Sequence, residues 1–450
     1  MSSFNDLKLS ESLMKAISSM GFEESTHIQE QTIPLAMSGR DVIGQAPTGT
    51  GKTAAFGIPM IEMCDDSPVI QGIVITPTRE LAIQVSEELN KIGQFKGIRA
   101  LPIYGGQEYK WQMKGLKEKP QILVGTPGRL VDHINTRKTI KVTDIKMLVL
   151  DEADEMLDMG FIDDIYAIIE KMPAERQTLL FSATMSAPIK RIALELMKNP
   201  QVVGGTDTKK IAMPVIVQHY VEVYEGNKFD ALCRILDIQC PDLAIVFVRT
   251  KKRVDEVQEG LTRRGYSASG LHGDLDQSKR TAIMKAFKDG KTQVLVATDV
   301  AARGLDVSDV SHVFNFDIPQ DPESYVHRIG RTGRAGKSGI AISFVTIREV
   351  RMLKWIEQVT GKRMTRMEVP STDEAIKGQQ RQILDSVLQV AEGEDAMKYR
   401  SLAEMLLNEK DSVTIVAAAL KMLIKEPDKT PVVLTQPSDS RRGGYRKSGK

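Results

Sequence analysis

The chain has 450 residues, 41% of them apolar and 27% charged, and its 61 basic and 59 acidic residues leave a net charge of only +2. This composition is typical of a globular protein of two or three domains, and it excludes a uniformly basic nucleic-acid-binding chain, so that any such surface must be local. The sequence contains no run of eighteen apolar residues and no signal-peptide pattern, so we expect a cytoplasmic protein with no membrane partner. Its three cysteines fit neither a disulfide framework nor a zinc site and are expected to be reduced.

The first 205 residues alternate short apolar runs with longer amphipathic segments. Continuous runs of this kind predict parallel strands that are covered by helices on both faces, the α/β class. Because ligands of such sheets bind beyond the carboxyl ends of the strands, the residues after each run are candidate site residues. The predicted strands are residues 42–44, 72–75, 122–124, 147–150 and 178–181.

A glycine-containing loop follows the first predicted strand and precedes a predicted helix. Gly49 and Gly51 let successive backbone N–H groups face phosphate oxygens. Lys52 is placed to reach the β- and γ-phosphates of ATP, and the Thr53 hydroxyl is placed to bind Mg²⁺. A chance glycine-rich turn is the alternative, but the strand and helix around the loop favour a nucleotide site. The whole loop comprises Ala46, Pro47, Thr48, Gly49, Thr50, Gly51, Lys52 and Thr53.

Two acidic residues, Asp151 and Glu152, follow the predicted strand at residues 147–150. Alone, such a pair is typical of a solvated helix start. Together with the phosphate loop, it predicts that Asp151 organises Mg²⁺, through water, and that Glu152 orients or deprotonates the attacking water. Asp154 is expected to pair with a positive group.

The pattern pauses after the first sheet and then resumes with predicted strands at residues 243–248, 293–297, 312–316 and 339–345. We therefore predict a first domain over 1–205, a linker over 206–215 and a second α/β domain over 216–362. Arg331 and Arg334, three residues apart at a glycine-rich helix start, are candidate arginine fingers for the γ-phosphate. Structural pairing of these arginines with acidic residues is the alternative.

The remainder of the chain contains no predicted strands. Ile383, Val387 and Val390 recur at helical spacing, which predicts a mainly helical extension over residues 363–435. Residues 436–450 are rich in Gly, Ser and basic side chains and are expected to form a disordered basic tail.

With these motifs in this order, residues 4–362 resemble the DEAD-box RNA helicases of superfamily 2. The resemblance implies two tandem RecA-like domains that close on ATP and RNA, RNA-stimulated ATP hydrolysis and local separation of RNA duplexes. The extension resembles that of cold-shock DEAD-box proteins from Gram-positive bacteria, in some of which such a segment forms a homodimer and a basic tail holds RNA. The alternative is that its apolar stripe packs onto the second domain. RNA-degradation and ribosome-assembly proteins are candidate partners.

The resemblance also assigns individual roles. Gln29 would read the adenine edge and Phe22 would stack on the ring, although Ser25 and His27 depart from the family pattern, which usually has proline where Ser25 stands. Asp299 would meet the ATP ribose. Residues expected to couple hydrolysis to strand separation are Asp154, Ser182, Thr184 and His327. Those expected to contact the RNA backbone are Arg79, Gly105, Gly106, Thr126, Gly128, Arg129, Arg249, Thr250, Gln277, Arg280 and Thr298.

Three other functions stay open at this point. A P-loop DNA helicase would share the phosphate loop, but the Gln29 segment and the acidic residues 151–154 argue against it. A non-catalytic RNA clamp that ATP only locks is disfavoured by Glu152, Arg331 and Arg334. Annealing without strand separation would indicate an RNA chaperone.

Overall fold

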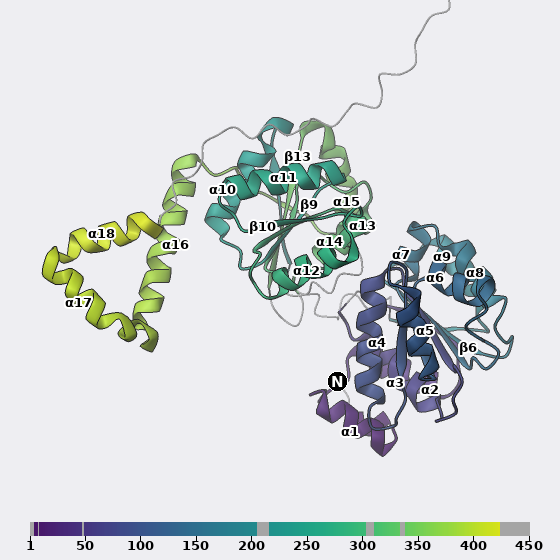
Figure 1. The fold of residues 1–450 in the computed structure, drawn as a ribbon. Helices are drawn as coiled ribbons and strands as arrows, with labels where there is room; N and C mark the ends of the chain where they lie inside the picture. The colour runs from purple at the N-terminus through teal and green to yellow at the C-terminus, as the bar shows by residue number, and fades with distance from the viewer. Residues whose placement is uncertain are drawn as a thin grey trace, which may run out of the picture. The chain divides into compact units, whose positions relative to one another are not determined.

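The computed structural model describes residues 4–7, 9–46, 49–204, 216–302, 310–333 and 338–423. The chain divides into two compact units, the first within residues 4–204 and the second within residues 216–423. Each unit contains a seven-stranded parallel sheet with helices packed against it (Figure 1). The predicted α/β class, with two tandem parallel-sheet domains and a helical C-terminal region, is confirmed. Within the described part of the chain, no helix is both long enough and apolar enough to span a membrane.

The sheet of the first unit has the strand order β3-β4-β2-β5-β6-β1-β7. Its strands are β1 (Val42–Gln45), β2 (Gly72–Ile75), β3 (Ala100–Ile103), β4 (Ile122–Gly125), β5 (Met147–Leu150), β6 (Gln177–Ser182) and β7 (Gln201–Gly204). The helices are α1 (Glu11–Ser19), α2 (His27–Met37), α3 (Lys52–Met63), α4 (Arg79–Gly93), α5 (Tyr109–Lys117), α6 (Pro127–Val131), α7 (Ala153–Asp158), α8 (Ile162–Ile169) and α9 (Ala187–Leu196), with short helical turns η1 (Phe4–Leu7) and η2 (Asp132–Thr136).

β5, at the centre of the sheet, is apolar at every position because both faces of the sheet are buried. Val149 of β5 packs into one hydrophobic cluster with side chains of α3 and α4, while Leu148 and Leu150 pack into a second cluster with α8 and α9. This arrangement leaves the carboxyl ends of the strands, with the loops that follow them, as the edge where polar site residues can collect.

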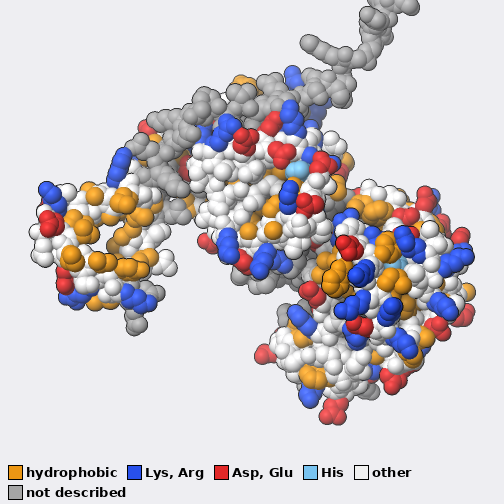
Figure 2. Space-filling model, in the orientation of Figure 1, with side chains coloured by type: hydrophobic (Ala, Val, Ile, Leu, Met, Phe, Trp, Pro, Cys, Tyr) orange, Lys and Arg blue, Asp and Glu red, His pale blue; other side chains and the backbone are white. Residues whose placement is uncertain are grey.

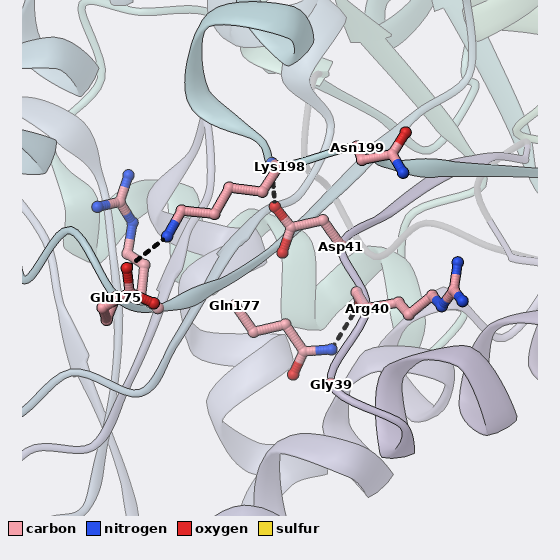
Figure 3. Close-up of a pocket in the computed structure, with 8 residues that line it drawn as sticks. Gly39, Arg40, Asp41, Glu175, Gln177, Lys198 and Asn199 are labelled. Atoms are coloured by element: carbon pink, nitrogen blue, oxygen red, sulfur yellow. Dashed lines mark hydrogen bonds and ion pairs between the residues drawn. The ribbon is translucent and has the colours of Figure 1, made fainter.

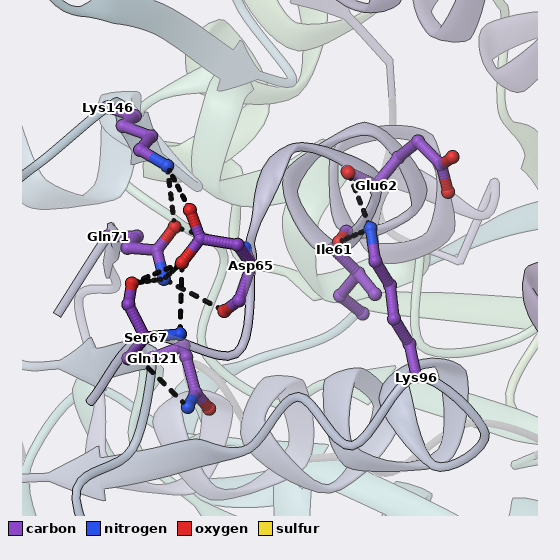
Figure 4. Close-up of polar contacts among 8 residues, drawn as sticks. All are labelled: Ile61, Glu62, Asp65, Ser67, Gln71, Lys96, Gln121 and Lys146. Atoms are coloured by element: carbon purple, nitrogen blue, oxygen red, sulfur yellow. Dashed lines mark hydrogen bonds and ion pairs between the residues drawn. The ribbon is translucent and has the colours of Figure 1, made fainter. Parts of the chain in front are cut away.

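The C-terminal end of α3 is fixed at the opposite, amino-terminal edge of the sheet. Lys96 donates from Nζ to the carbonyl oxygens of Ile61 and Glu62, at 3.0 and 2.6 Å, and so satisfies the end of the helix. In the loop that follows α3, Asp65 and Gln71 both accept from Lys146 Nζ, at 2.9 and 2.8 Å (Figure 4). These contacts hold the helix whose first residue is Lys52.

The sheet of the second unit has the order β10-β11-β9-β12-β13-β8-β14. Its strands are β8 (Ile216–Glu222), β9 (Ala244–Phe247), β10 (Ala268–Leu271), β11 (Val294–Ala297), β12 (His312–Asn315), β13 (Gly339–Val345) and β14 (Thr365–Arg366). The helices that accompany this sheet are α10 (Lys228–Gln239), α11 (Lys251–Arg263), α12 (Gln277–Lys288), α13 (Asp299–Ala302), α14 (Pro322–Ile329) and α15 (Val350–Thr360), with turns η3 (Glu225–Asn227) and η4 (Ile347–Glu349).

The second sheet continues beyond residue 362, where the sequence pattern placed its end. β14 pairs with β8, and Met364 is buried in the cluster around α14 and α15. Three helices and a turn follow: α16 (Thr372–Glu392), η5 (Glu394–Tyr399), α17 (Arg400–Glu409) and α18 (Ser412–Leu423).

The first part of α16 packs against α10, where Ala375 is buried. The predicted linker, residues 206–215, and the predicted basic tail, residues 436–450, lie outside the described residues.

Candidate nucleotide and RNA sites

One position of the phosphate loop, Gly51, has a backbone conformation that favours glycine. Gly51 has φ +87° and forms the N-cap of α3, which begins at Lys52. Lys52 is buried, and its Nζ lies 3.9 Å from Oδ1 of Asp151, the residue after β5. β6 lies between β1 and β5, so the phosphate loop and the acidic residues meet at the same edge of one sheet.

Three charged groups at this edge are buried, and each has an atom without a hydrogen bond to the described part of the chain, although Lys52 and Asp151 form a long ion pair. Lys52 Nζ, Asp151 Oδ1 and Glu152 Oε2 have no hydrogen-bond partner within the described residues. Burial raises the pKa of Asp151 to about 7, with Lys52 opposing the shift and Glu152 adding to it. Buried charged atoms that lack hydrogen bonds are costly, so this arrangement fits a ligand that supplies phosphate oxygens to the lysine and a cation to the carboxylates.

Glu152 itself adopts a left-handed backbone conformation, with φ 54° and ψ 53°, as the N-cap of α7. Such a conformation is strained for a side chain with a Cβ. Non-glycine residues held this way gather at functional sites, which agrees with the role predicted for Glu152.

Gln29 lies against the phosphate loop. Its Nε2 donates to the carbonyl oxygen of Gly51 at 3.1 Å, and its Oε1 accepts from the backbone N–H of Thr26 at 2.9 Å. A Cβ added to Gly51 would clash with the Gln29 amide. Phe22 stacks on Phe4, with ring centroids 6.3 Å apart. The structure thus places Gln29 beside the phosphate loop. A residue that recognises the base of a bound nucleotide must lie close to this loop.

The predicted coupling residues of the first unit also meet. Asp154 Oδ2 accepts from the backbone N–H and the hydroxyl of Thr184, at 2.8 and 3.1 Å. Ser182, at the end of β6, donates from its hydroxyl to the carbonyl oxygen of Thr184 at 2.6 Å. A chain of hydrogen bonds therefore connects the residues after β5 with those after β6.

The RNA candidates of the first unit follow the other half of the sheet, after β2, β3 and β4. The guanidinium of Arg79 lies against the two glycines, since a Cβ on Gly106 would lie 2.7 Å from Arg79 Cζ and one on Gly105 would lie 3.6 Å from its Nη2. Arg129 donates to the carbonyl oxygen of Gln107 at 3.3 Å. Thr126 and Gly128 stand at the start of α6.

In the second unit, a residue without a predicted role binds one of the candidate site residues. Arg328, on α14, is buried and holds both oxygens of Asp299, with Nε–Oδ1 2.5 Å and Nη2–Oδ2 2.8 Å. Its Nη1 donates to Asn315 Oδ1 at 3.2 Å and to the carbonyl oxygen of Asp317 at 2.6 Å. His327 is half-buried on the same helix, and Arg331 is buried just after it.

The RNA candidates of the second unit lie after β9, β10 and β11. Arg249 is exposed and pairs with Glu349 at 3.7 Å, while its backbone N–H donates to Asp317. Arg280 donates to the carbonyl oxygen of Ala301 at 3.4 Å. Thr250 and Gln277 stand at the starts of α11 and α12, and Thr298 precedes α13. Pro47, Thr48 and Arg334 lie outside the described residues.

One open pocket lies away from all of these residues. It has a volume of about 570 Å³ and is lined by Arg40, Asp41, Arg176 and Lys198, among others (Figure 3). Its lining comes from the segments before β1, β6 and β7, at the amino-terminal edge of the sheet. Asp41 accepts there from the backbone N–H groups of Thr178 and Lys198, at 2.8 and 2.6 Å, so these polar groups fasten the edge together.

Comparisons with known proteins agree with this geometry. The family model described as DEAD/DEAH box helicase matches residues 26–192, and that described as helicase conserved C-terminal domain matches residues 227–336. A DEAD-box ATP-dependent RNA helicase, CshA of Geobacillus kaustophilus, is 58% identical over 437 residues, which cover 97% of this chain and 93% of the relative. The chain belongs to the DEAD-box family of ATP-dependent RNA helicases.

Other DEAD-box helicases extend the comparison. CshA of Bacillus subtilis is 58% identical, with 99% of this chain and 91% of the relative covered. Dbp5 of S. cerevisiae, solved bound to RNA and ADP BeF3, has a TM-score of 0.76 and is 34% identical, covering 84% of this chain and 100% of that one. The sequence-based assignment to an ATP-dependent, nucleotide-binding RNA helicase is confirmed.

Proposed function

We propose that this helicase separates short RNA duplexes locally, with ATP and RNA each favouring the same working conformation. Each ligand then raises the affinity for the other, and hydrolysis releases the RNA. The observation that carries this proposal is that buried charged atoms of Lys52, Asp151 and Glu152 lack hydrogen bonds within the described residues, with only a 3.9 Å ion pair between Lys52 and Asp151. A site that is costly when empty favours the nucleotide-bound state.

ATP would be held by residues of the first unit. Gln29 and Phe22 would recognise adenine, the backbone after Gly49 would bind phosphate oxygens, and Lys52 would face the β- and γ-phosphates. Thr53 and Asp151 would hold Mg²⁺, Asp151 through water. The ion, when bound, neutralises charge on the phosphates. The raised pKa of Asp151 fits this role, because a cation would replace the missing stabilisation of its charged form.

Glu152 would accept the proton of the attacking water, and its fixed backbone would aim the carboxylate. Arg331 and Arg334 would place positive charge on the transferring phosphoryl group. Asp299 would meet the ribose, oriented by Arg328. Asp154, Ser182 and Thr184, together with His327, would couple hydrolysis to the RNA.

The RNA candidates would contact phosphates and sugars rather than base edges. Arg79 against Gly105 and Gly106 offers a cation beside two residues that have no side chains. Such contacts bind RNA without sequence preference and distinguish it from DNA through the 2′-hydroxyl groups.

We also propose that the extension forms a homodimer. The helices α16, α17 and α18 expose many large apolar side chains, among them Leu388, Val390, Met405 and Val413, each at least 63% exposed (Figure 2). Apolar surface of this kind marks an interaction site. Sedimentation of the full chain and of a chain ending at residue 370 tests this, because only the full chain should dimerise.

The function itself is tested by ATP hydrolysis with single-stranded RNA or DNA of one sequence, together with separation of a short RNA duplex. We expect stimulation by RNA and strand separation that requires ATP. Lys52→Ala, which removes the cation at the phosphates, should abolish nucleotide binding, and Arg331→Ala should lower turnover by about 10³-fold. Equal stimulation by DNA would favour the DNA helicase, and annealing alone would favour the chaperone.

A further inference from the structure

Helix α5 carries a basic face with an exposed tryptophan that the motifs do not use. Lys110, Lys114 and Lys117 recur at the spacing of one helix face and are exposed, and α5 itself contains no acidic residue. Trp111 is 61% exposed beside them, and Lys114 Nζ lies 5.9 Å from its ring centroid. In Figure 2, Lys and Arg side chains gather on the first unit over α4 and α5.

The opposite face of α5 is fixed to the loop that contains the two glycines. Gln112 is buried, donates to the carbonyl oxygen of Tyr104 at 2.8 Å and contacts His133 Nε2 at 3.1 Å. Trp111 therefore has a fixed place in the first turn of α5, five residues after Gly106.

Two arginines extend the basic surface next to this turn. Arg129 and Arg137 both lie over the ring of Tyr109, at 4.3 and 3.8 Å from its centroid. Few acidic groups lie nearby. Asp132 pairs with Arg137 at 3.5 Å and offsets its charge, Glu118 pairs with Arg99, Glu108 precedes the helix, and the Asp164 carboxylate lies near Gly128. The surface is thus positive and continuous with a candidate RNA contact.

We infer that the face formed by Lys110, Trp111, Lys114 and Lys117 binds single-stranded RNA where the strand leaves the contacts at Arg79, Gly105, Gly106 and Arg129. A base would stack on Trp111, and the lysines would bind the neighbouring phosphates of the RNA backbone. An exposed aromatic side chain among cations is the arrangement that binds single strands without sequence preference. The inference rests on RNA binding by the motif residues, as proposed above.

The test compares the full chain on a 6-nucleotide and an 18-nucleotide uridine RNA, with ADP and beryllium fluoride, by fluorescence anisotropy. In the unaltered chain the longer RNA should bind more tightly. Trp111→Ala should lower the ratio of the two affinities by at least about 5-fold, because stacking contributes roughly 1–3 kcal/mol per base. Trp111→Phe should retain most of the ratio, since the stacking surface remains.

Phe95 provides the matched control, because it is also exposed and has a lysine, Lys15, 4.8 Å from its ring centroid. It lies before β3, at the amino-terminal edge of the sheet, and Phe95→Ala should leave the ratio unchanged. Equal effects of Trp111→Ala and Phe95→Ala would overturn the inference, as would a loss in Trp111→Phe as large as that in Trp111→Ala. If this face of α5 binds a protein instead of RNA, Trp111→Ala and Phe95→Ala will have equal effects on RNA binding.

The lysines are tested separately by salt dependence. Lys110→Gln with Lys114→Gln should reduce the slope of log affinity against log salt, on the longer RNA, by about 1.4, from roughly 0.7 per phosphate contact. The control pair, Lys15→Gln with Lys91→Gln, removes the same charge elsewhere, and an equal change in slope would contradict the inference. If the unaltered chain bound neither RNA, that result would contradict the proposed function itself and not only the role inferred for α5.

Discussion

Arg328 holds Asp299 by two parallel hydrogen bonds, Nε–Oδ1 at 2.5 Å and Nη2–Oδ2 at 2.8 Å. Planar two-point pairing of this kind is specific to arginine, because lysine is a point charge. The contact ties α14, which carries His327 and leads to Arg331, to the residues after β11. A buried side chain thereby fixes the position of several candidate site residues at once.

Arg328→Lys should therefore keep the charge but lose the geometry. We expect a loss of about 2 kcal/mol in the free energy of unfolding, since the buried Asn315 and the half-buried Asp299 would lose hydrogen-bond partners. RNA-stimulated kcat should fall while Arg351→Lys, an exposed change on α15, leaves it unaltered. Turnover of the Arg328→Lys enzyme at the normal rate would show that this pair serves stability alone.

Glu152→Gln should separate binding from chemistry. The amide preserves the shape of the side chain but cannot accept the proton of the attacking water, so we expect turnover to fall by roughly 10²- to 10⁴-fold while ATP and RNA remain bound. Single-turnover hydrolysis and equilibrium nucleotide binding measure the two effects. Glu170→Gln, at the exposed end of α8, is the control, and ordinary hydrolysis by Glu152→Gln would reassign the catalytic carboxylate.

Gly51→Ala should disturb nucleotide recognition through Gln29. The added Cβ would clash with the Gln29 amide, whereas a Cβ on Gly39, which has a similar φ of +78°, would meet nothing within 4 Å. Both substitutions should lower stability by about 1 kcal/mol, because alanine is strained at positive φ. Only Gly51→Ala should weaken ATP binding, by about 10-fold or more, which titration of a fluorescent nucleotide would detect. Equal nucleotide affinities of the two variants would argue against a role of Gln29.

The buried His312 should make the free energy of unfolding depend on pH. Burial lowers its pKa from 6.5 to about 4, with Asp242 opposing the shift. As pH falls below about 6.5, the unfolded chain takes up the proton first, so the free energy of unfolding decreases until the pH reaches about 4. His312→Gln should reduce the loss of stability between pH 7 and pH 5, measured by urea unfolding, by on the order of 1–2 kcal/mol. His27→Gln, an exposed change in α2, is the control, and identical pH dependence in both variants would refute this origin.

The central strands were predictable, whereas the edge strands were not. β5, buried on both faces, is apolar throughout and was predicted at its observed bounds. The edge strands β3, β7, β10 and β14 were missed: β3 contains Pro102, β10 contains Ser269 and Gly270, and β14 has only two residues. An edge strand lacks a neighbour on one side and tolerates such residues, so it leaves a weak pattern. β8 was missed as well, because Gln218 and His219 interrupt its apolar run.

The candidate site was predictable as a set of motifs but not as a set of contacts. The sequence places Lys52 and Asp151 after two strands, and the strand order then brings them to 3.9 Å. Arg328 was missed, although its spacing carried a signal. It lies three residues after Tyr325 and one before Ile329, so all three share the buried face of α14. An arginine on a buried face requires an acidic partner, but spacing alone does not name Asp299.

The left-handed backbone at Glu152 has a consequence for how this protein tolerates change. A glycine or an asparagine at that position would relax the chain, because both accept positive φ more readily than glutamate does. A substitution there that relieves strain would also remove the carboxylate that we propose accepts the proton of the attacking water. At this residue, higher stability and faster ATP hydrolysis would therefore require different side chains.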